Sequence, residues 1–210
     1  MMGLQAIIDQ QLKKYQKWDF LVFMLLTLLS VLNGQTTVFY LMYFFWWNEV
    51  IRLIVDRLYF KKNPNAINED WQSTGFMGGL FSMGVYWVFL IVFFGFIAVS
   101  DNREIILTNV EIVFFQNWFF NLNLIFVLFE RIYLHQKQQP LTIYFGAFNP
   151  NMIVLHVSII VGGLILFFLV KRFPETFTPE NQWGSVVIVF PFLLLKMLNQ
   201  KLSSDNHNLK

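Results

Sequence analysis

The chain has 210 residues, of which 56% are hydrophobic, 19% aromatic and only 13% charged, about half the charged share of a soluble globular domain. It contains no cysteine, which excludes disulfides, thiolate metal sites and cofactors attached through cysteine. The net charge of +2 comes without a basic stripe or a glycine-rich phosphate loop, so no nucleic-acid partner is expected. This composition indicates a protein whose main partner is the lipid bilayer.

The first 18 residues, MMGLQAIIDQQLKKYQKW, combine apolar residues at helical spacing with lysines on the other faces. This pattern predicts an amphipathic helix that lies on the membrane surface. The apolar run FLVFMLLTLLSVL follows, and no small-residue cleavage site comes after it. We therefore expect a retained membrane helix here and not a removed signal peptide.

Long apolar runs predict further membrane helices, because a hydrocarbon core of about 30 Å takes roughly 20 apolar residues as helix. Polar turns and loops such as NGQTT, KKNPNAINEDWQSTG and SDNRE separate these runs. Pro191 is expected to kink the last helix. The six predicted spans cover residues 19–32, 36–60, 76–99, 112–134, 152–170 and 183–195.

The predicted fold class is an all-α membrane protein, a bundle of about six transmembrane helices preceded by a short interfacial helix. Its parts are an amphipathic helix (1–18), a six-span transmembrane domain (19–199) and a polar C-terminal tail (200–210). The longest connections have about 15 residues, which leaves no room for a soluble domain.

The distribution of lysine and arginine predicts the orientation of the spans. Eleven of these residues fall on the side of the two termini and three on the opposite side. The eleven are Lys13, Lys14, Lys17, Arg57, Lys61, Lys62, Arg131, Lys137, Lys196, Lys201 and Lys210, and the three are Arg103, Lys171 and Arg172. By the positive-inside rule both termini are cytoplasmic, in what we expect to be a bacterial inner membrane.

The second predicted span carries charges inside an aromatic run, FFWWNEVIRLIVDRLYF. Glu49, Arg52 and Asp56 are spaced i, i+3, i+7 and so share one helix face, with Asn48 at i−4 from Arg52. Charges in a span are costly unless they pair, so we expect this ladder to point into the bundle.

Two interpretations of the ladder stay open. In the first, it is an ion-pair network that fixes packing, with Asp56 and Arg57 solvated at the cytoplasmic edge. In the second, it is a proton or substrate site, for which Glu49 is the better candidate because it lies nearer the middle of the membrane.

Other polar residues of the spans are weaker candidates. His156 is most simply a packing residue, and Lys196 is expected to reach the cytoplasmic interface, with pairing to Asp56 or Glu130 as the alternative. The paired glycines Gly162 and Gly163 predict close helix contact. The fourth span holds further polar residues that suit interhelical hydrogen bonds: Gln116, Asn117, Asn121, Asn123 and Glu130.

Three segments, YFFWWNEVIRLI, NPNMIVLHVSIIVGG and FPFLLLKMLNQK, resemble in the same order segments of a family of bacterial multi-pass membrane proteins that is described only as a domain of unknown function. The resemblance covers most of the chain. It implies the multi-pass topology and marks Glu49, His156 and Lys196 as the positions that match the family pattern. It implies no activity.

Three functions fit these observations. The first is a non-enzymatic subunit or accessory factor of a membrane complex, which small size and the amide-rich fourth span favour. The second is a small transporter or channel that uses Glu49, Arg52, Asp56 and His156.

The third is a rhomboid-like intramembrane hydrolase in which Ser82 and His156 form a dyad. It is the least favoured, because a serine beside glycine on a membrane helix is commonly a packing residue. A haem or metal site would need more ligands than the spans offer, so no cofactor is expected.

Overall fold

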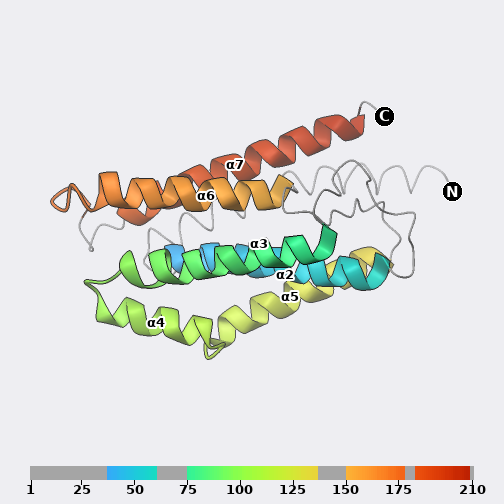
Figure 1. Ribbon diagram of the computed structural model, residues 1–210, viewed down its shortest axis with the longest axis horizontal. Helices are drawn as coiled ribbons and strands as arrows, with labels where there is room; N and C mark the ends of the chain where they lie inside the picture. Colours follow the sequence, from blue (N-terminus) through green and yellow to red (C-terminus); the bar gives the residue numbers. More distant parts are fainter. Residues whose placement is uncertain (1–36, 61–74, 137–149, 178–182, 209–210) are drawn as a thin grey trace, which may run out of the picture.

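The computed structural model describes residues 37–60, 75–136, 150–177 and 183–208, and this part of the chain is helical without strands (Figure 1). The predicted N-terminal helix and first span lie outside the described residues. The elements in order are α2 (Val38–Phe60), α3 (Gly75–Phe89), the π-helical segment η3 (Leu90–Ile97), α4 (Arg103–Val113), α5 (Trp118–Gln136), α6 (Pro150–Ile165), the π-helical segment η4 (Leu166–Val170) and α7 (Trp183–Asn208).

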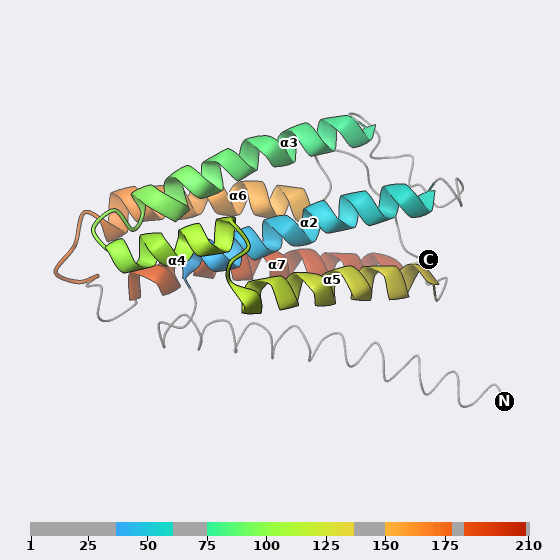
Figure 2. The same cartoon turned by 90° about the horizontal axis from the view of Figure 1, so that it is seen from below.

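Helix α2 is the central element of the bundle. It contacts α3, α4, α5, α6 and α7, while α6 and α7 pack along each other (Figures 1 and 2). Of its most apolar stretch 61% is buried, against 11% to 33% in the other three helices of membrane-spanning length. The residues on α2 are therefore the ones placed to act inside the bundle.

Aromatic side chains form the core around α2. The ring of Tyr43 stacks on Phe39 at 5.1 Å between centroids, on Trp46 at 5.7 Å and on Phe120 of α5 at 5.6 Å. The indole of Trp46 also donates a hydrogen bond to the carbonyl oxygen of Met83 on α3, at 2.8 Å. Offset aromatic packing, together with the hydrogen bond of the Trp46 indole, holds α2, α3 and α5 together.

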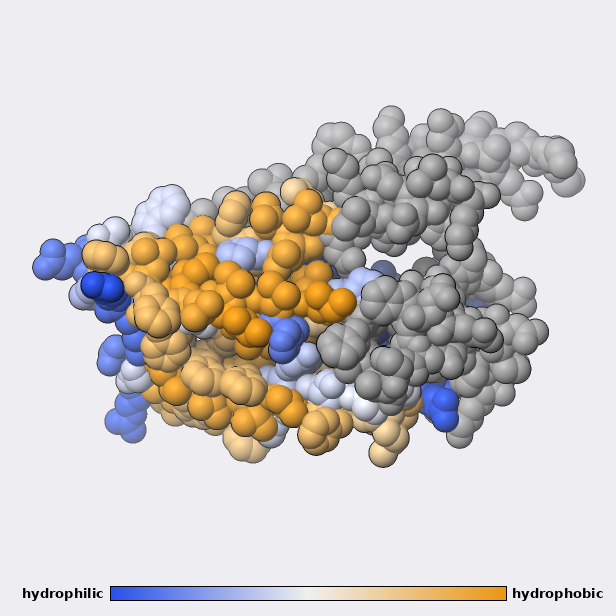
Figure 3. Space-filling view, turned by 45° about the horizontal axis from the view of Figure 1, so that its top comes forward, coloured by the Kyte–Doolittle hydropathy of each residue, from blue (hydrophilic) through white to orange (hydrophobic). Residues whose placement is uncertain are grey.

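Four helical stretches are long and apolar enough to cross a membrane: Val38–Tyr59, Gly75–Ile97, Arg103–Tyr133 and Pro150–Val170. A fifth apolar stretch, Trp183–Leu198, is shorter. Hydrophobic side chains cover most of the described surface on the face seen in Figure 3, as a helix bundle in lipid requires. The second, third and fifth predicted spans match described helices closely.

The fourth predicted span differs from the structure. We expected it to start at residue 112, but α4 already begins at Arg103, because the side chain of Asn102 accepts hydrogen bonds from the backbone of Glu104 and Ile105 and caps the helix. The helix then breaks before α5 starts at Trp118. At the break Phe115 has φ 57°, a conformation that a helix cannot continue.

Gly162 and Gly184 allow neighbouring helices to approach closely. A methyl group on Gly162 would lie 3.3 Å from Phe94 and 3.4 Å from Ile188, and one on Gly184 would lie 2.9 Å from Val170. Gly163 has open space instead. The predicted glycine contact therefore involves Gly162 and not its neighbour.

Candidate functional site: a buried ion-pair network

The charged ladder of α2 is buried and internally paired. The guanidinium of Arg52 donates from Nε to Glu49 Oε2 at 2.8 Å and from Nη1 to Asp56 Oδ2 at 3.4 Å. Glu49 is 5% exposed, Arg52 8% and Asp56 0%. The i, i+3, i+7 spacing thus produces one continuous inward-facing row, in which an arginine links two carboxylates.

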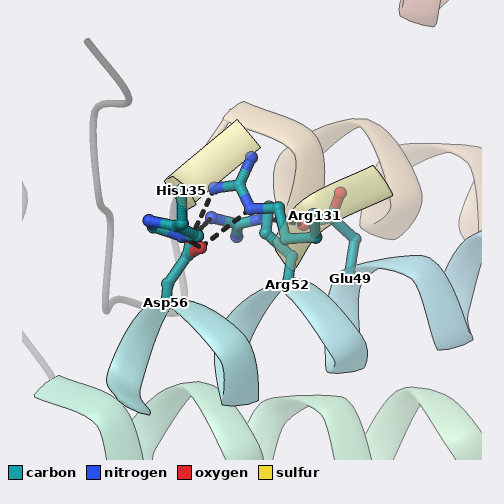
Figure 4. A network of polar contacts seen from close by, with 5 residues as sticks. All are labelled: Glu49, Arg52, Asp56, Arg131 and His135. Carbon is teal, nitrogen blue, oxygen red and sulfur yellow. Dashed lines mark hydrogen bonds and ion pairs between the residues drawn. The ribbon is translucent and has the colours of Figure 1, made fainter. Parts of the chain in front are cut away.

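Helix α5 supplies two more partners for Asp56 (Figure 4). Arg131 donates from Nε to Oδ1 at 2.8 Å and from Nη2 to Oδ2 at 2.7 Å, a bidentate pair. His135 Nε2 lies 2.8 Å from Oδ1. Both oxygens of one carboxylate are therefore held by side chains from two helices.

The expected position of Asp56 at a solvated edge is wrong. Its carboxylate is fully buried, because Arg131 and His135 cover it from α5 and occupy both oxygens. A buried carboxylate is tolerated when cations and hydrogen-bond donors satisfy it. The burial of a charge thus depends on which helix packs over it. The spacing of residues along α2 alone does not predict that neighbour.

Arg131 and His135 belong to this site, although the sequence analysis did not place them in it. They are spaced i, i+4 and so share one face of α5. The ring of His135 also stacks on Tyr59 of α2, with centroids 4.5 Å apart and planes 7° from parallel. One face of α5 is therefore matched to the last two turns of α2.

Lys196 of α7 approaches the same network from another side. Its ammonium lies 4.5 Å from the centroid of the Phe45 ring, a cation–π contact, and it is close enough to Glu49 and Arg52 for electrostatic interaction. The Lys196 side chain was expected to extend to the cytoplasmic interface, but in the structure it contacts α2 instead. Asn48 is half-buried on α2.

The amides of the fourth span divide into two groups. Asn123 donates to the Tyr40 hydroxyl at 2.8 Å and so joins α5 to α2. Asn117 and Asn121 instead bond backbone at the break before α5, to the Phe120 amide and the Phe115 carbonyl. Gln116 and Glu130 are exposed, so among the described residues Asn123 is the one of the five candidates that makes an interhelical hydrogen bond.

His156 lies apart from the network. It is exposed on α6, with its ring 5.2 Å from that of Tyr86 on α3. Among the described residues no hydrogen bond joins His156 to Ser82, as the dyad of a hydrolase would require. The described helices also hold no group of three metal-ligating side chains.

Comparisons with family models, curated proteins and solved structures find no match to this chain. The resemblance to a bacterial membrane family therefore stays a prediction. Function has to be argued from the contacts of the site itself.

Proposed function

We propose that this chain is a non-enzymatic subunit or accessory factor of a membrane complex, in which the Asp56 network is a structural clamp between α2 and α5. One observation carries the proposal: the Asp56 carboxylate is fully buried and both of its oxygens are already bonded to cationic or donor side chains. A carboxylate in this state has no oxygen left for a transported ion or a substrate. Its role is to hold two helices in register.

The proposed topology has about six spans, with both termini in the cytoplasm of a bacterium and the spans in its inner membrane. One contact supports the placement of two connections, the one after η3 and the one after η4, on the same side of the membrane. Lys171, at the end of η4, donates from Nζ to the carbonyl oxygen of Ile97 at 2.8 Å and lies 3.4 Å from the hydroxyl oxygen of Ser100. The turn after η3 and the end of η4 are thus neighbours, as two connections on one membrane side require.

Purification of the tagged protein from its own membrane in gentle detergent tests the proposal. Mass spectrometry should find a second protein at a fixed ratio to this chain, and the ratio should persist through size-exclusion chromatography. A tagged membrane protein of similar size, expressed at the same level, controls for non-specific capture. Purification of the chain alone, from several detergents and from native nanodiscs, would contradict the proposal.

A small transporter is the second candidate, and Glu49 is the observation that favours it. Among the described residues this buried carboxylate accepts one hydrogen bond, from Arg52, and Lys196 is within electrostatic range. It is thus less fully bonded than Asp56 and better able to exchange a proton. Flux in proteoliposomes that Glu49→Gln abolishes and Glu130→Gln leaves unchanged would favour transport over the subunit role.

A further inference from the structure

Helix α4 has one buried face and one polar face. Asn109 and Ile112, each 1% exposed, point into the bundle. Glu104, Thr108 and Glu111 are spaced i, i+4, i+7 and are all exposed, and we call these three the polar face of α4. A polar stripe is ordinary on a soluble helix, but α4 is the first part of a membrane-length stretch, Arg103–Tyr133.

The rotation of α4 about its axis is fixed by the buried face. Asn109 donates from Nδ2 to the Gly95 carbonyl at 3.0 Å, and its Oδ1 accepts from the Thr37 hydroxyl at 3.2 Å. A rotation that turned Glu111 inward would break both hydrogen bonds and leave a buried amide unsatisfied. The polar face therefore cannot be hidden inside the described bundle.

The environment of Glu111 makes an isolated carboxylate unfavourable. It lies eight residues beyond Arg103, about 12 Å along the helix. Apolar exposed side chains flank it on α4 and at the break, namely Leu107, Phe114 and Phe115, and the exposed polar side chains near it, Thr108 and Gln116, carry no charge. Within the described part of the chain no hydrogen bond or ion pair satisfies the Glu111 side chain. A carboxylate placed against lipid in this way requires a partner.

We propose that the polar face of α4 binds a transmembrane helix of a partner subunit, and that this helix presents lysine or arginine together with hydroxyl or amide side chains. The inference rests on the proposed subunit role and adds the surface and its chemistry. Basic side chains complement Glu104 and Glu111. The Thr108 hydroxyl donates to the Glu104 carbonyl oxygen at 3.1 Å and can still accept a hydrogen bond from a hydroxyl or amide of the partner. The fit is by charge, which also sets the specificity of the contact.

Two other occupants match this surface less well. A second copy of the chain that used the same face would bring Glu111 near Glu111, and like charges repel. The chain's own run at 20–32, FLVFMLLTLLSVL, contains no lysine or arginine and cannot neutralise a carboxylate. Charge complementarity therefore favours a different protein.

Photocrosslinking in the native membrane tests the inference. A photoreactive amino acid at position 108 should give one adduct of fixed mass with another protein. The same amino acid in place of Phe81, which is 76% exposed on α3, should give lipid adducts only. An adduct at position 108 with residues 1–36 of the same chain, with a second copy, or with lipid alone would overturn the inference.

Substitution of Glu111 provides the second readout. Glu111→Lys should lower the amount of co-purified partner by about tenfold or more. Glu111→Leu should also lower it, and it removes the cost of placing an unpaired carboxylate against lipid in the chain without its partner. Because Glu111 is exposed, the thermal stability of the purified variants should match that of the wild type, which separates lost binding from lost folding. A partner that co-purifies at the wild-type ratio with both variants would overturn this inference and leave the subunit role intact, whereas the complete absence of a partner contradicts both.

Discussion

Arg131 and Asp56 stand 75 positions apart in the chain and meet through two parallel hydrogen bonds, 2.8 Å from Nε to Oδ1 and 2.7 Å from Nη2 to Oδ2. This bidentate geometry joins α5 to α2 at a point where Arg52 and His135 also contact the carboxylate. In an apolar environment such a pair acts as a specific connection, since either charge alone is unfavourable there.

Asp56→Asn should therefore destabilise the bundle strongly, by about 3–5 kcal/mol in the free energy of unfolding, because it leaves the buried Arg52 and the partly buried Arg131 without their shared carboxylate. Unfolding by denaturant in mild detergent, followed by circular dichroism, measures the change. Glu130→Gln is the matched control: Glu130 precedes Arg131 on α5 and is exposed, so its substitution should have little effect.

A double substitution separates the pair from its surroundings. Asp56→Leu combined with Arg131→Met removes both charges and should cost less than the sum of the two single substitutions, with a coupling of about 1–3 kcal/mol. Additive losses would mean that the two side chains stabilise the fold independently. That result would contradict the role of the Asp56–Arg131 pair as a clamp between α2 and α5.

The sequence was informative where local spacing decides the structure. The apolar run between NGQTT and KKNPN predicts a span at 36–60, and α2 occupies Val38–Phe60. The i, i+3, i+7 spacing of Glu49, Arg52 and Asp56 predicts their common face, and in the structure that face is buried. Both features depend on neighbours within two helical turns.

Features that depend on packing between distant segments were not predictable in the same way. The partners of Asp56 lie 75 and 79 positions away on α5, and nothing in the α2 sequence specifies them. Lys196 contacts Phe45 because α7 packs beside α2, although its place at the end of the predicted span 183–195 suggested the interface. The break between α4 and α5 combines a positive φ at Phe115 with a hydrogen bond from the Phe120 amide to the Asn117 side chain, and the hydropathy of residues 112–134 does not reveal it.

The close approach of α7 to η4 yields another prediction. Gly184→Ala places a methyl group 2.9 Å from Val170 Cγ1, and a stiff β-branched side chain cannot yield cheaply. We expect a loss of about 1–3 kcal/mol from overpacking, measured by the same unfolding experiment.

Gly163→Ala is the control for this change, because a methyl group at Gly163 meets nothing within 4 Å. Both substitutions replace a helical glycine by alanine. The gain in helix propensity, about 0.5–1 kcal/mol in a helix interior, applies to Gly163 of α6 and is smaller for Gly184, the second residue of α7. A difference between the two variants that exceeds this gain therefore reports packing. Equal effects would show that α7 and η4 are farther apart than in the structure.

Asn109 provides a further prediction through its two hydrogen bonds, to Thr37, the residue before α2, and to Gly95 on η3. Asn109→Leu should cost about 1–3 kcal/mol, because it leaves the Thr37 hydroxyl and the Gly95 carbonyl without this partner. In that background Thr37→Val should have a smaller effect than in the wild type. If Thr37→Val costs the same in both backgrounds, the two side chains do not form a bridge in the membrane.

His135 combines two contacts that a pair of substitutions can separate: a ring stack on Tyr59 and a hydrogen-bond contact with Asp56. His135→Phe keeps an aromatic ring against Tyr59 and loses the polar contact, for an expected cost of about 1–3 kcal/mol. His135→Gln keeps a donor that can reach Asp56 and loses the stack, for about 0.5–1.5 kcal/mol.

Unfolding free energies of the two variants rank the contacts, and we expect the phenylalanine variant to be the less stable because it removes a bond to a fully buried carboxylate. The reverse order would mean that Arg52 and Arg131 satisfy Asp56 without help, and that His135 serves mainly to pack the ends of α2 and α5 together.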